Sequence, residues 1–499
     1  MFRCGSPLVK ELDTQALALE PDTHLQLLAE RALARTGGAP LIAGNAVRIL
    51  KDSTENFPAW MEAIERARKF ILFENYIIAN DEIGQQFVAA LAAKARQGVR
   101  VRLIYDFGGS LVSSRLFAPL VAAGAEVRCF NPPRLDSPLG WLMRDHRKMV
   151  AVDGEVAFIT GLCVARRWMG HPARGIPPWR DTGVEVRGPA VAEIERAFAQ
   201  AWKAAGPALP EAELTAGGAI APVGQVTVMV VATEPTSAGL YRLDQFIATV
   251  ARRTLWLTDA YYVGTPAYVE ALRAAARDGV DVRILVPGSS DLPITQAFSR
   301  AGYRPLLEAG IRVFEWNGSM LHAKTAVADG RWSRVGSSNL NLSSWLANYE
   351  LDLAVYDKGF GRQMDEMYLA DLEQATEIVL RERNRVRPVR EARPPQMTPV
   401  RGSASRAAAS ALRIGNTVNA ALTNRRILGP SEAGLMFKVG LVLLVMALLG
   451  IVWPEVVAVP VGLFAGWVGI ALVIRAWRLR KGTPEEADGA KSAEEGRQR

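Results

Sequence analysis

Apolar residues in this chain follow first a helical and then a strand period, and this change of period occurs twice in nearly the same form. Residues 87–106 read FVAALAAKARQGVRVRLIYD, and residues 268–287 read YVEALRAAARDGVDVRILVP. In each stretch the apolar positions keep helical spacing up to a glycine, Gly98 or Gly279, and alternate with polar positions after it. We therefore predict a helix, a glycine cap and a strand in each stretch.

The repetition extends over most of the chain. Residues 67–78 (ARKFILFENYII) match 251–263 (ARRTLWLTDAYYV), and the run that ends at Asn131 (LVAAGAEVRCFN) matches the run that ends at Asn317 (LLEAGIRVFEWN). Each half reads as strand, helix, strand, helix, strand and one further strand, an order typical of an α/β fold. We predict two duplicated α/β lobes that pack about a pseudo-twofold axis and form one catalytic unit.

The last of these strands carries the same polar pattern in both halves: a histidine, a lysine two residues later and an aspartate five residues after that. The residues are His146, Lys148 and Asp153 in the first half and His322, Lys324 and Asp329 in the second. Strand alternation puts each histidine and its lysine on one face. A neutral imidazole can attack phosphorus, an imidazolium can protonate the leaving alcohol, and two ammonium groups can hold a phosphate. A single such pair would more often be structural, but two in register predict phosphodiester chemistry in a cleft between the lobes.

Nearby residues supply the remaining groups that such a site needs. The turn at residues 336–339 (GSSN) offers Ser337 and Asn339 as donors to phosphate oxygens, and Glu350 can accept a ring N–H and so orient a histidine. In the first half Asp181 is the counterpart of Glu350, while the turn reads TGLC and ends in Cys163. The two aspartates of the repeated pattern point away from the histidines along the strand, which favours a framework role for them over a catalytic one.

Charge is concentrated in one segment. The chain carries a formal net charge of +8, and residues 381–426 contain eleven arginines and two glutamates, a net of 11 − 2 = +9. Such a segment could meet nucleic acid or an anionic membrane surface. The apolar residues that follow it favour the membrane and argue against nucleic acid as a partner. Only three cysteines occur in 499 residues, which fits a reducing compartment better than a disulfide framework.

Two uncharged runs lie near the C-terminus, at residues 439–453 and 456–474. The second has nineteen residues, about 28 Å as a helix and roughly the thickness of bilayer hydrocarbon. Pro454 and Glu455 separate the runs, and basic residues flank both open ends, so we predict a transmembrane hairpin whose ends face the cytoplasm. A pair of buried core helices is the alternative.

The predicted division of the chain is a helical extension at 1–40, α/β lobes at 41–205 and 225–380, a basic linker and juxtamembrane helix at 381–430, the hairpin at 435–475 and a polar tail at 482–499.

With these motifs the chain resembles the phospholipase D superfamily, which is known for paired HxKxxxxD motifs, and within it the bacterial cardiolipin synthases. The similarity spans residues 44–357 and includes DHRKMVAVDGEVAFITGL and LHAKTAVADGRWSRVGSSNLNLSSWLANYELDL. It implies transfer of a phosphatidyl group from phosphatidylglycerol to a second phosphatidylglycerol, with release of glycerol and without a metal or other cofactor. It also implies that His146 forms a phosphohistidine, that His322 acts as acid and base, and that Lys148, Lys324 and Asn339 bind the phosphate. The six residues of the two motifs are the family's catalytic set. The resemblance further implies a bacterial inner membrane enzyme whose catalytic lobes face the cytoplasm.

The chain departs from the family pattern in two respects. Many of these synthases carry membrane helices at the amino end, whereas the apolar runs here lie at the other end. Cys163 and Thr160 stand where an asparagine and a glycine are expected, so the two halves need not bind phosphate equally. Two other functions stay open: a hydrolase of phospholipids or nucleic acids that uses the same histidines with water as acceptor, and a scaffold with a relic site. Oligomeric state is not predicted.

Overall fold

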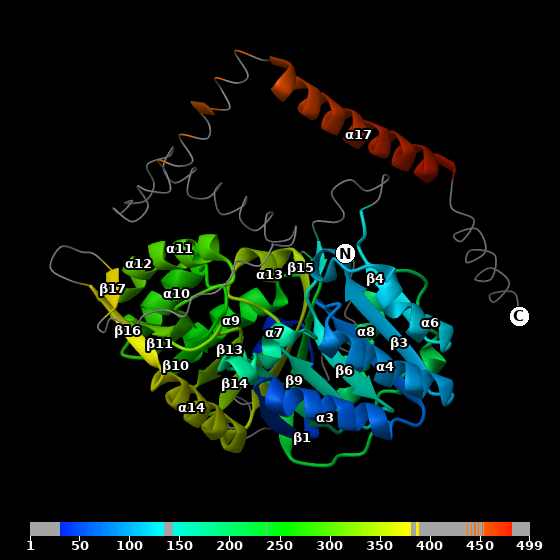
Figure 1. Ribbon diagram of the computed structural model, residues 1–499. Coiled ribbons are helices and arrows are strands. Elements are labelled where there is room, and N and C mark those ends of the chain that lie inside the picture. Colours follow the sequence, from blue (N-terminus) through cyan, green and yellow to red (C-terminus); the bar gives the residue numbers. More distant parts are fainter. Residues whose placement is uncertain are drawn as a thin grey trace, which may run out of the picture.

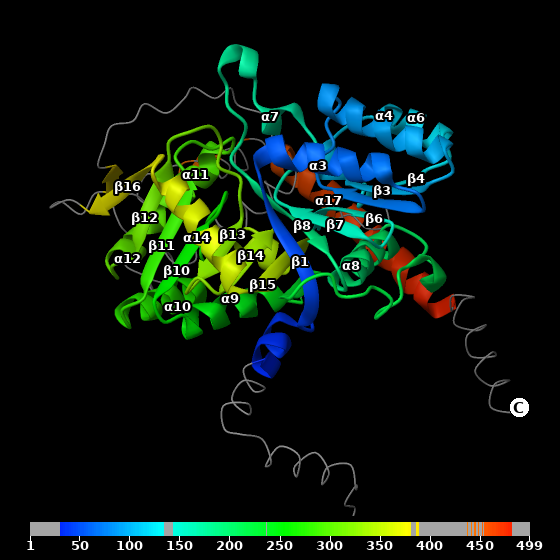
Figure 2. The same ribbon diagram turned by 90° about the horizontal axis from the view of Figure 1, so that it is seen from below.

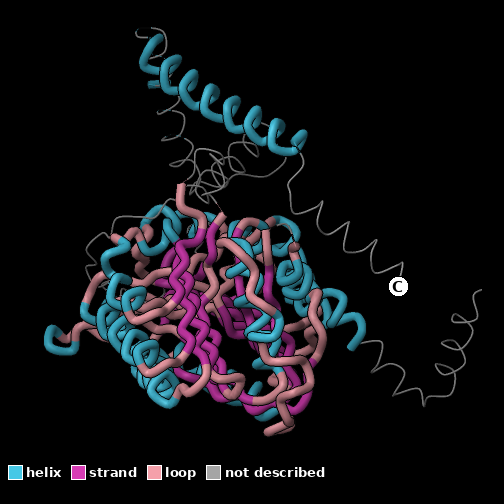
Figure 3. The backbone as a smooth tube through the Cα atoms, turned by 90° about the vertical axis from the view of Figure 1, so that its right-hand side faces the viewer, coloured by secondary structure: helices cyan, strands magenta, loops and turns pink. Residues whose placement is uncertain are grey.

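The computed structural model describes residues 30–133, 143–235, 237–380, 386–388 and 454–481, and scattered positions between 437 and 452. The predicted extension at 1–40, the juxtamembrane helix and the polar tail lie wholly or largely outside these residues. Within them, two α/β lobes lie side by side, with the strands at the centre and most helices outside (Figures 1 and 3).

The first lobe is built on a mixed sheet. Its strands are β1 (Ile42–Lys51), β2 (Phe70–Asn75), β3 (Arg100–Asp106), β4 (Glu126–Phe130), β5 (Arg144–Asp145), β6 (Lys148–Val152), β7 (Val156–Thr160) and β8 (Thr182–Arg187). Seven of them pair in the order β1-β8-β7-β6-β2-β3-β4, in which only the β2–β3 and β3–β4 pairs are parallel. The helices are α3 (Asp52–Arg66), α4 (Glu82–Arg96), α5 (Phe107–Ser110), α6 (Ala118–Ala122), α7 (Arg166–Met169) and α8 (Ala190–Ala204).

The second lobe repeats this sheet strand for strand. Its strands are β9 (Val226–Thr233), β10 (Thr254–Thr258), β11 (Asp281–Pro287), β12 (Arg312–Trp316), β13 (Thr325–Ala328), β14 (Trp332–Gly336), β15 (Asn348–Tyr356), β16 (Ala375–Leu380) and β17 (Val386–Pro388). The order is β9-β15-β14-β13-β10-β11-β12, with β16 and β17 added beyond β12. The helices are α9 (Gly239–Val250), α10 (Pro266–Arg277), α11 (Pro293–Ala301), α12 (Tyr303–Leu307), α13 (Leu342–Leu346) and α14 (Lys358–Leu372). The predicted duplication is confirmed at the level of topology.

Local chemistry explains where the repeated elements begin and end. The Asp81 carboxylate accepts from two amides at the start of α4, and the Thr265 hydroxyl accepts from the Tyr268 amide at the start of α10. After each helix the chain turns through a glycine with positive φ, +88° at Gly98 and +89° at Gly279, a conformation that a side chain disfavours. The helix, glycine cap and strand predicted in each half are therefore present.

The two lobes share a core. Strand β1 pairs antiparallel both with β8 of its own lobe and with β9 of the other, and it runs between the two sheets (Figure 2). One buried cluster joins apolar residues from both sheets to helices α8 and α14. Burial of this continuous apolar surface fixes the lobes relative to each other, which the site requires because each lobe supplies half of it.

The predicted transmembrane hairpin is not supported. The later of its two runs forms helix α17 (Pro454–Lys481), whereas most of the earlier run lies outside the described residues. In the part of the chain that the structure describes, no helix combines the length and the apolar character needed to cross a bilayer.

Candidate active site

The two histidines lie in extended segments that lead into strands. His146 precedes β6, which begins at Lys148, and His322 precedes β13, which begins just after Lys324. His322 and Lys324 were predicted to lie on the strand, but the strand begins one residue after Lys324. The segment before it pairs with the other lobe and does not extend the sheet of its own lobe.

The backbone contacts of the two histidines cross between the lobes in a symmetric way. The His146 amide donates to the carbonyl of Tyr349 (2.9 Å), and the His322 amide donates to the carbonyl of Arg180 (2.7 Å). Each acceptor directly precedes the carboxylate predicted to orient a histidine, Glu350 or Asp181. The segment before each histidine also pairs in parallel with the carboxylate-bearing segment of the other lobe. This pairing sets the register of each imidazole against its carboxylate.

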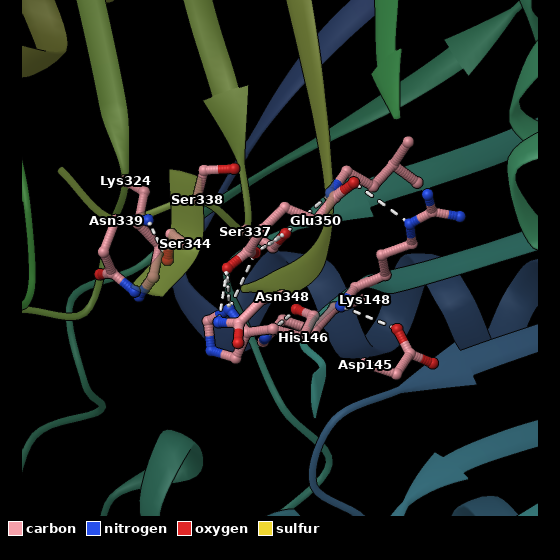
Figure 4. A network of polar contacts seen from close by, with 12 residues as sticks. Asp145, His146, Lys148, Lys324, Ser337, Ser338, Asn339, Ser344, Asn348 and Glu350 are labelled. Atoms are coloured by element: carbon pink, nitrogen blue, oxygen red, sulfur yellow. Dashed lines mark hydrogen bonds and ion pairs between the residues drawn. The ribbon is translucent and has the colours of Figure 1, made fainter. Parts of the chain in front are cut away.

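Each imidazole is held by a carboxylate from the other lobe. Nδ1 of His146 lies 2.9 Å and 3.0 Å from the two oxygens of Glu350 (Figure 4). Nδ1 of His322 lies 2.7 Å from Oδ2 of Asp181. With Nδ1–H donating to the carboxylate, the lone pair of a neutral ring is on Nε2, so Nε2 is the atom available for chemistry. The sequence identified both carboxylates but not which histidine each would hold.

The carboxylates are fixed in turn by polar neighbours. Glu350 accepts hydrogen bonds from the hydroxyl of Ser337 and the amide of Asn348 (3.2 Å), and Asp181 accepts one from the indole N–H of Trp168 (3.0 Å). Burial alone would raise the pKa of both carboxylates, but the facing histidine and lysine outweigh it, so both pKa values lie below the ordinary range. Both groups are therefore anionic and can stabilise an imidazolium.

Both histidines line one cavity. The cavity and its open mouth enclose about 700 Å³ of empty space. Its other lining residues are mainly aromatic and small polar ones: Tyr76, Ile77, Cys163, Arg167, Trp168, Trp179, Tyr261, Asp291, Leu292, Asn339, Asn341, Ser343, Ser344 and Asn348. The lining comes from both lobes, as a site shared by the repeated halves requires.

Burial makes both imidazoles neutral in the free protein. It lowers the pKa of His146 to about 4 and that of His322 to about 3; the nearby lysines add to this effect, and the carboxylates oppose it. The sequence led us to expect one neutral ring and one imidazolium. A bound phosphodiester adds a negative charge beside both rings and favours protonation of one of them, so the acid is expected to form on substrate binding.

The two lysines are buried beside the backbone of the histidines. Both are almost fully buried, and each ammonium group donates to the backbone carbonyl of the histidine two residues before it. The Lys324 ammonium also lies 3.0 Å from Nδ1 of His322. Burial, partly offset by Asp181 and reinforced by Lys148, lowers the pKa of Lys324 to about 8.

This lowered pKa predicts an alkaline limit to activity. Below pH 8 Lys324 is charged and attracts an anionic substrate; above pH 8 it loses its proton, so kcat/KM should fall about tenfold per pH unit. Arginine stays charged throughout this range, so Lys324→Arg should show no fall between pH 8 and 10 in whatever activity it retains. A wild-type profile that is flat over this range would contradict the prediction.

The two aspartates of the repeated pattern hold backbone at the far end of each strand. Asp153 accepts from the amides of Arg68, Lys69 and Phe70, at 2.7–2.8 Å. Asp329 accepts from the amides of residues 252–254 at 2.7–2.9 Å. Among the described residues neither aspartate contacts a histidine, so the geometry supports the framework role and not a catalytic one.

We expect Asp153→Ala to destabilise the fold rather than to slow the reaction. The change removes three amide hydrogen bonds to a carboxylate and puts alanine at φ +58°, so the free energy of unfolding should fall by about 2–4 kcal/mol. Urea denaturation measures this loss. Asp153→Asn, which tolerates positive φ, should lose less. A stable Asp153→Ala protein without activity would contradict the assignment.

The turn at residues 336–339 differs from its predicted role in one residue. Ser337 is fully buried, donates to Glu350 and accepts from the Leu351 amide, so it orients the carboxylate and is not available to a phosphate. Asn339 lines the cavity, and its Oδ1 has no hydrogen-bond partner among the described residues. Its counterpart Cys163 also lines the cavity, and burial raises the pKa of its thiol.

Sequence reasoning missed several residues that build the site. Asn348 lies two positions before Glu350 on β15, and this spacing could have placed it on the same face. The ring of Trp168 contacts the His322 ring (5.1 Å between centroids), and its indole N–H donates to Asp181. The ring of Tyr76 contacts the ring of His146, with 4.8 Å between the ring centroids. Within the described residues, no group of three or more His, Cys, Asp or Glu side chains is arranged to hold a metal ion.

Comparison with known proteins agrees with this geometry. The family model for the cardiolipin synthase, PLD-like domain matches residues 60–202 and 247–372, one segment in each lobe. Cardiolipin synthase A of Pseudomonas putida (strain W619) is 35% identical over 359 residues, which cover 70% of this chain and 73% of that protein. Cardiolipin synthase of Geobacillus kaustophilus (strain HTA426) is 33% identical over 349 residues, 69% of each.

A solved structure shares the fold. The phosphatidylserine synthase of Haemophilus influenzae Rd KW20 superposes with a TM-score of 0.55 at 14% identity and covers 70% of this chain and 91% of its own. Because the family model spans both lobes and the relatives align over most of their length, the chain belongs to the phospholipase D-like family of cardiolipin synthases.

Proposed function

We propose that the protein is a phosphatidyltransferase of the cardiolipin synthase type, which moves a phosphatidyl group from one phosphatidylglycerol to another through a covalent phosphohistidine. One observation carries the proposal: a histidine from each lobe lines the same cavity, and each is held by a carboxylate of the opposite lobe. The names of the relatives supply the product, cardiolipin, whose synthesis from phosphatidylglycerol is part of the proposal.

The first step forms the covalent intermediate. Nε2 of His146 attacks the phosphorus of the donor lipid, and the bond from phosphorus to the oxygen of the headgroup glycerol breaks. Protonated His322 gives its proton to that oxygen, and free glycerol leaves. Two features support His146 as the nucleophile. Both oxygens of Glu350 face its Nδ1, which raises ring basicity, whereas the ammonium group of Lys324 lies 3.0 Å from Nδ1 of His322 and lowers the basicity of that ring.

The second step reverses these roles. The hydroxyl of the second phosphatidylglycerol attacks phosphorus, its proton passes to neutral His322, and the bond from phosphorus to His146 breaks to release cardiolipin. Lys148, Lys324 and Asn339 are the phosphate-binding groups. The positive charge of the buried lysines favours the added negative charge of the transition state because little water screens it there.

The substrates give the expected location of the protein. Both are membrane lipids, and the basic segment at 381–430 provides positive charge for an anionic surface. We propose that the lobes work at the cytoplasmic face of the bacterial inner membrane.

The test is the product formed from purified protein and phosphatidylglycerol in mixed micelles. We expect equal amounts of cardiolipin and glycerol. Phosphatidic acid with glycerol, without cardiolipin, would mean that water is the acceptor and that the protein is a hydrolase. Cleavage of nucleic acid without lipid turnover would reject both lipid reactions.

A further inference from the structure

Arg167 lies in the wall of the catalytic cavity, on the short helix α7 of the first lobe. Its guanidinium carbon is 5.0 Å from the ring centroid of Trp168 and 5.6 Å from that of Trp179. Both rings also contact the imidazole of His322, at 5.1 and 5.8 Å between centroids. A fixed positive charge is therefore held on the aromatic wall that adjoins the acid–base histidine.

In the described part of the chain no carboxylate forms an ion pair or a hydrogen bond with Arg167, although this residue is half-buried. The preceding Arg166, by contrast, lies 2.7 Å from Glu82. The acidic residue of the described lining, Asp291, accepts a hydrogen bond from the hydroxyl of Tyr261 (2.8 Å) and comes from the other lobe.

The proposed reaction brings two phosphodiesters into this cavity. The transferring phosphorus is bound between the histidines, with the buried lysines beneath it. The acceptor lipid carries its own phosphate three carbons from the attacking hydroxyl, so a second negative charge must enter beside the first. Without a compensating cation this second charge would be repelled by the first in a partly enclosed site.

We propose that Arg167, stacked on Trp168 and Trp179, binds the phosphodiester of the acceptor lipid and so selects an anionic lipid alcohol over a neutral alcohol. This inference rests on the proposed function. A guanidinium suits the task because it binds two phosphate oxygens at once while its face stays on an aromatic ring.

The experiment compares two acceptors in one preparation. Cardiolipin formation from phosphatidylglycerol uses the anionic acceptor, whereas incorporation of labelled glycerol into phosphatidylglycerol uses a neutral one. Both reactions share the same donor, covalent step and histidines. Variants Arg167→Ala and Arg167→Lys are compared with Arg166→Ala, which removes a charge from the same helix but not from the cavity lining.

We expect Arg167→Ala to lower cardiolipin formation at least about tenfold relative to glycerol exchange, mainly through KM for the acceptor, and Arg167→Lys to lose less. Arg166→Ala should leave the ratio of the two rates unchanged. Equal loss of both reactions in Arg167→Ala, an unchanged ratio, or the same change in Arg166→Ala would overturn the assignment. A wild-type protein that performs neither reaction would instead reject the proposed function.

Discussion

Replacing His146 or His322 by alanine should lower cardiolipin formation by about 10³-fold or more, the largest effect expected for any single change in this protein. His146 supplies the nucleophile and His322 the proton, and no other histidine lines the cavity among the described residues. The rate of glycerol release from phosphatidylglycerol measures the loss. His171, which does not line the cavity, provides the matched control, and His171→Ala should keep wild-type turnover.

The two variants should differ when the leaving group no longer needs a proton. A phosphatidyl ester of p-nitrophenol releases a stable anion, so His322→Ala should form the covalent intermediate from it at a rate near that of wild type. His146→Ala should stay inactive with the same donor. If the ester rescues His146→Ala and not His322→Ala, the roles of the two histidines are reversed.

Replacing Glu350 by glutamine should lower turnover by about 10²-fold or more, the second largest effect. The carboxylate fixes the tautomer of His146 and stabilises positive charge on the ring, and removal of such an orienting group commonly costs 10–100-fold, or more where the wrong tautomer results. Asp181→Asn should have a similar effect through His322, and only this variant should be rescued by the p-nitrophenol ester. Glu377→Gln, in a surface ion pair with Arg312, is the control and should be neutral.

A double variant tests the crossed pairing. If Glu350 acts through His146, Glu350→Gln should add nothing once His146 is alanine, although the two residues are 204 positions apart in the sequence. Independent, additive losses would show that the carboxylate has another role.

The repeat in the sequence was sufficient to predict the duplicated α/β lobes. Apolar periodicity together with Gly98 and Gly279 located the repeated helix and strand, because local hydrogen bonding and burial decide both. The same logic placed the lysines and histidines in one site. Which carboxylate would hold which histidine was not predictable. His146 meets Glu350 because β5 pairs with β15, and no local sequence pattern reports a contact between such distant segments.

The roles that the sequence misjudged depend on what else lies nearby. Ser337 was predicted to donate a hydrogen bond to a phosphate oxygen, but its hydroxyl donates to the neighbouring carboxylate of Glu350 instead. The protonation of the histidines depends on burial, which lowers both pKa values and which a motif does not show. The membrane hairpin was predicted from two long uncharged runs with flanking basic residues, but no helix of the described residues is long and apolar enough to cross a membrane.

The most direct test of the account is the site of the covalent intermediate. Protein mixed with phosphatidylglycerol labelled with ³²P should, after rapid alkaline quenching and digestion, carry an acid-labile label on the peptide that contains His146. The label should vanish in His146→Ala and, with the p-nitrophenol ester, should persist in His322→Ala because the second step lacks its base. Label on the His322 peptide alone, or turnover with no labelled protein at any time, would contradict the mechanism.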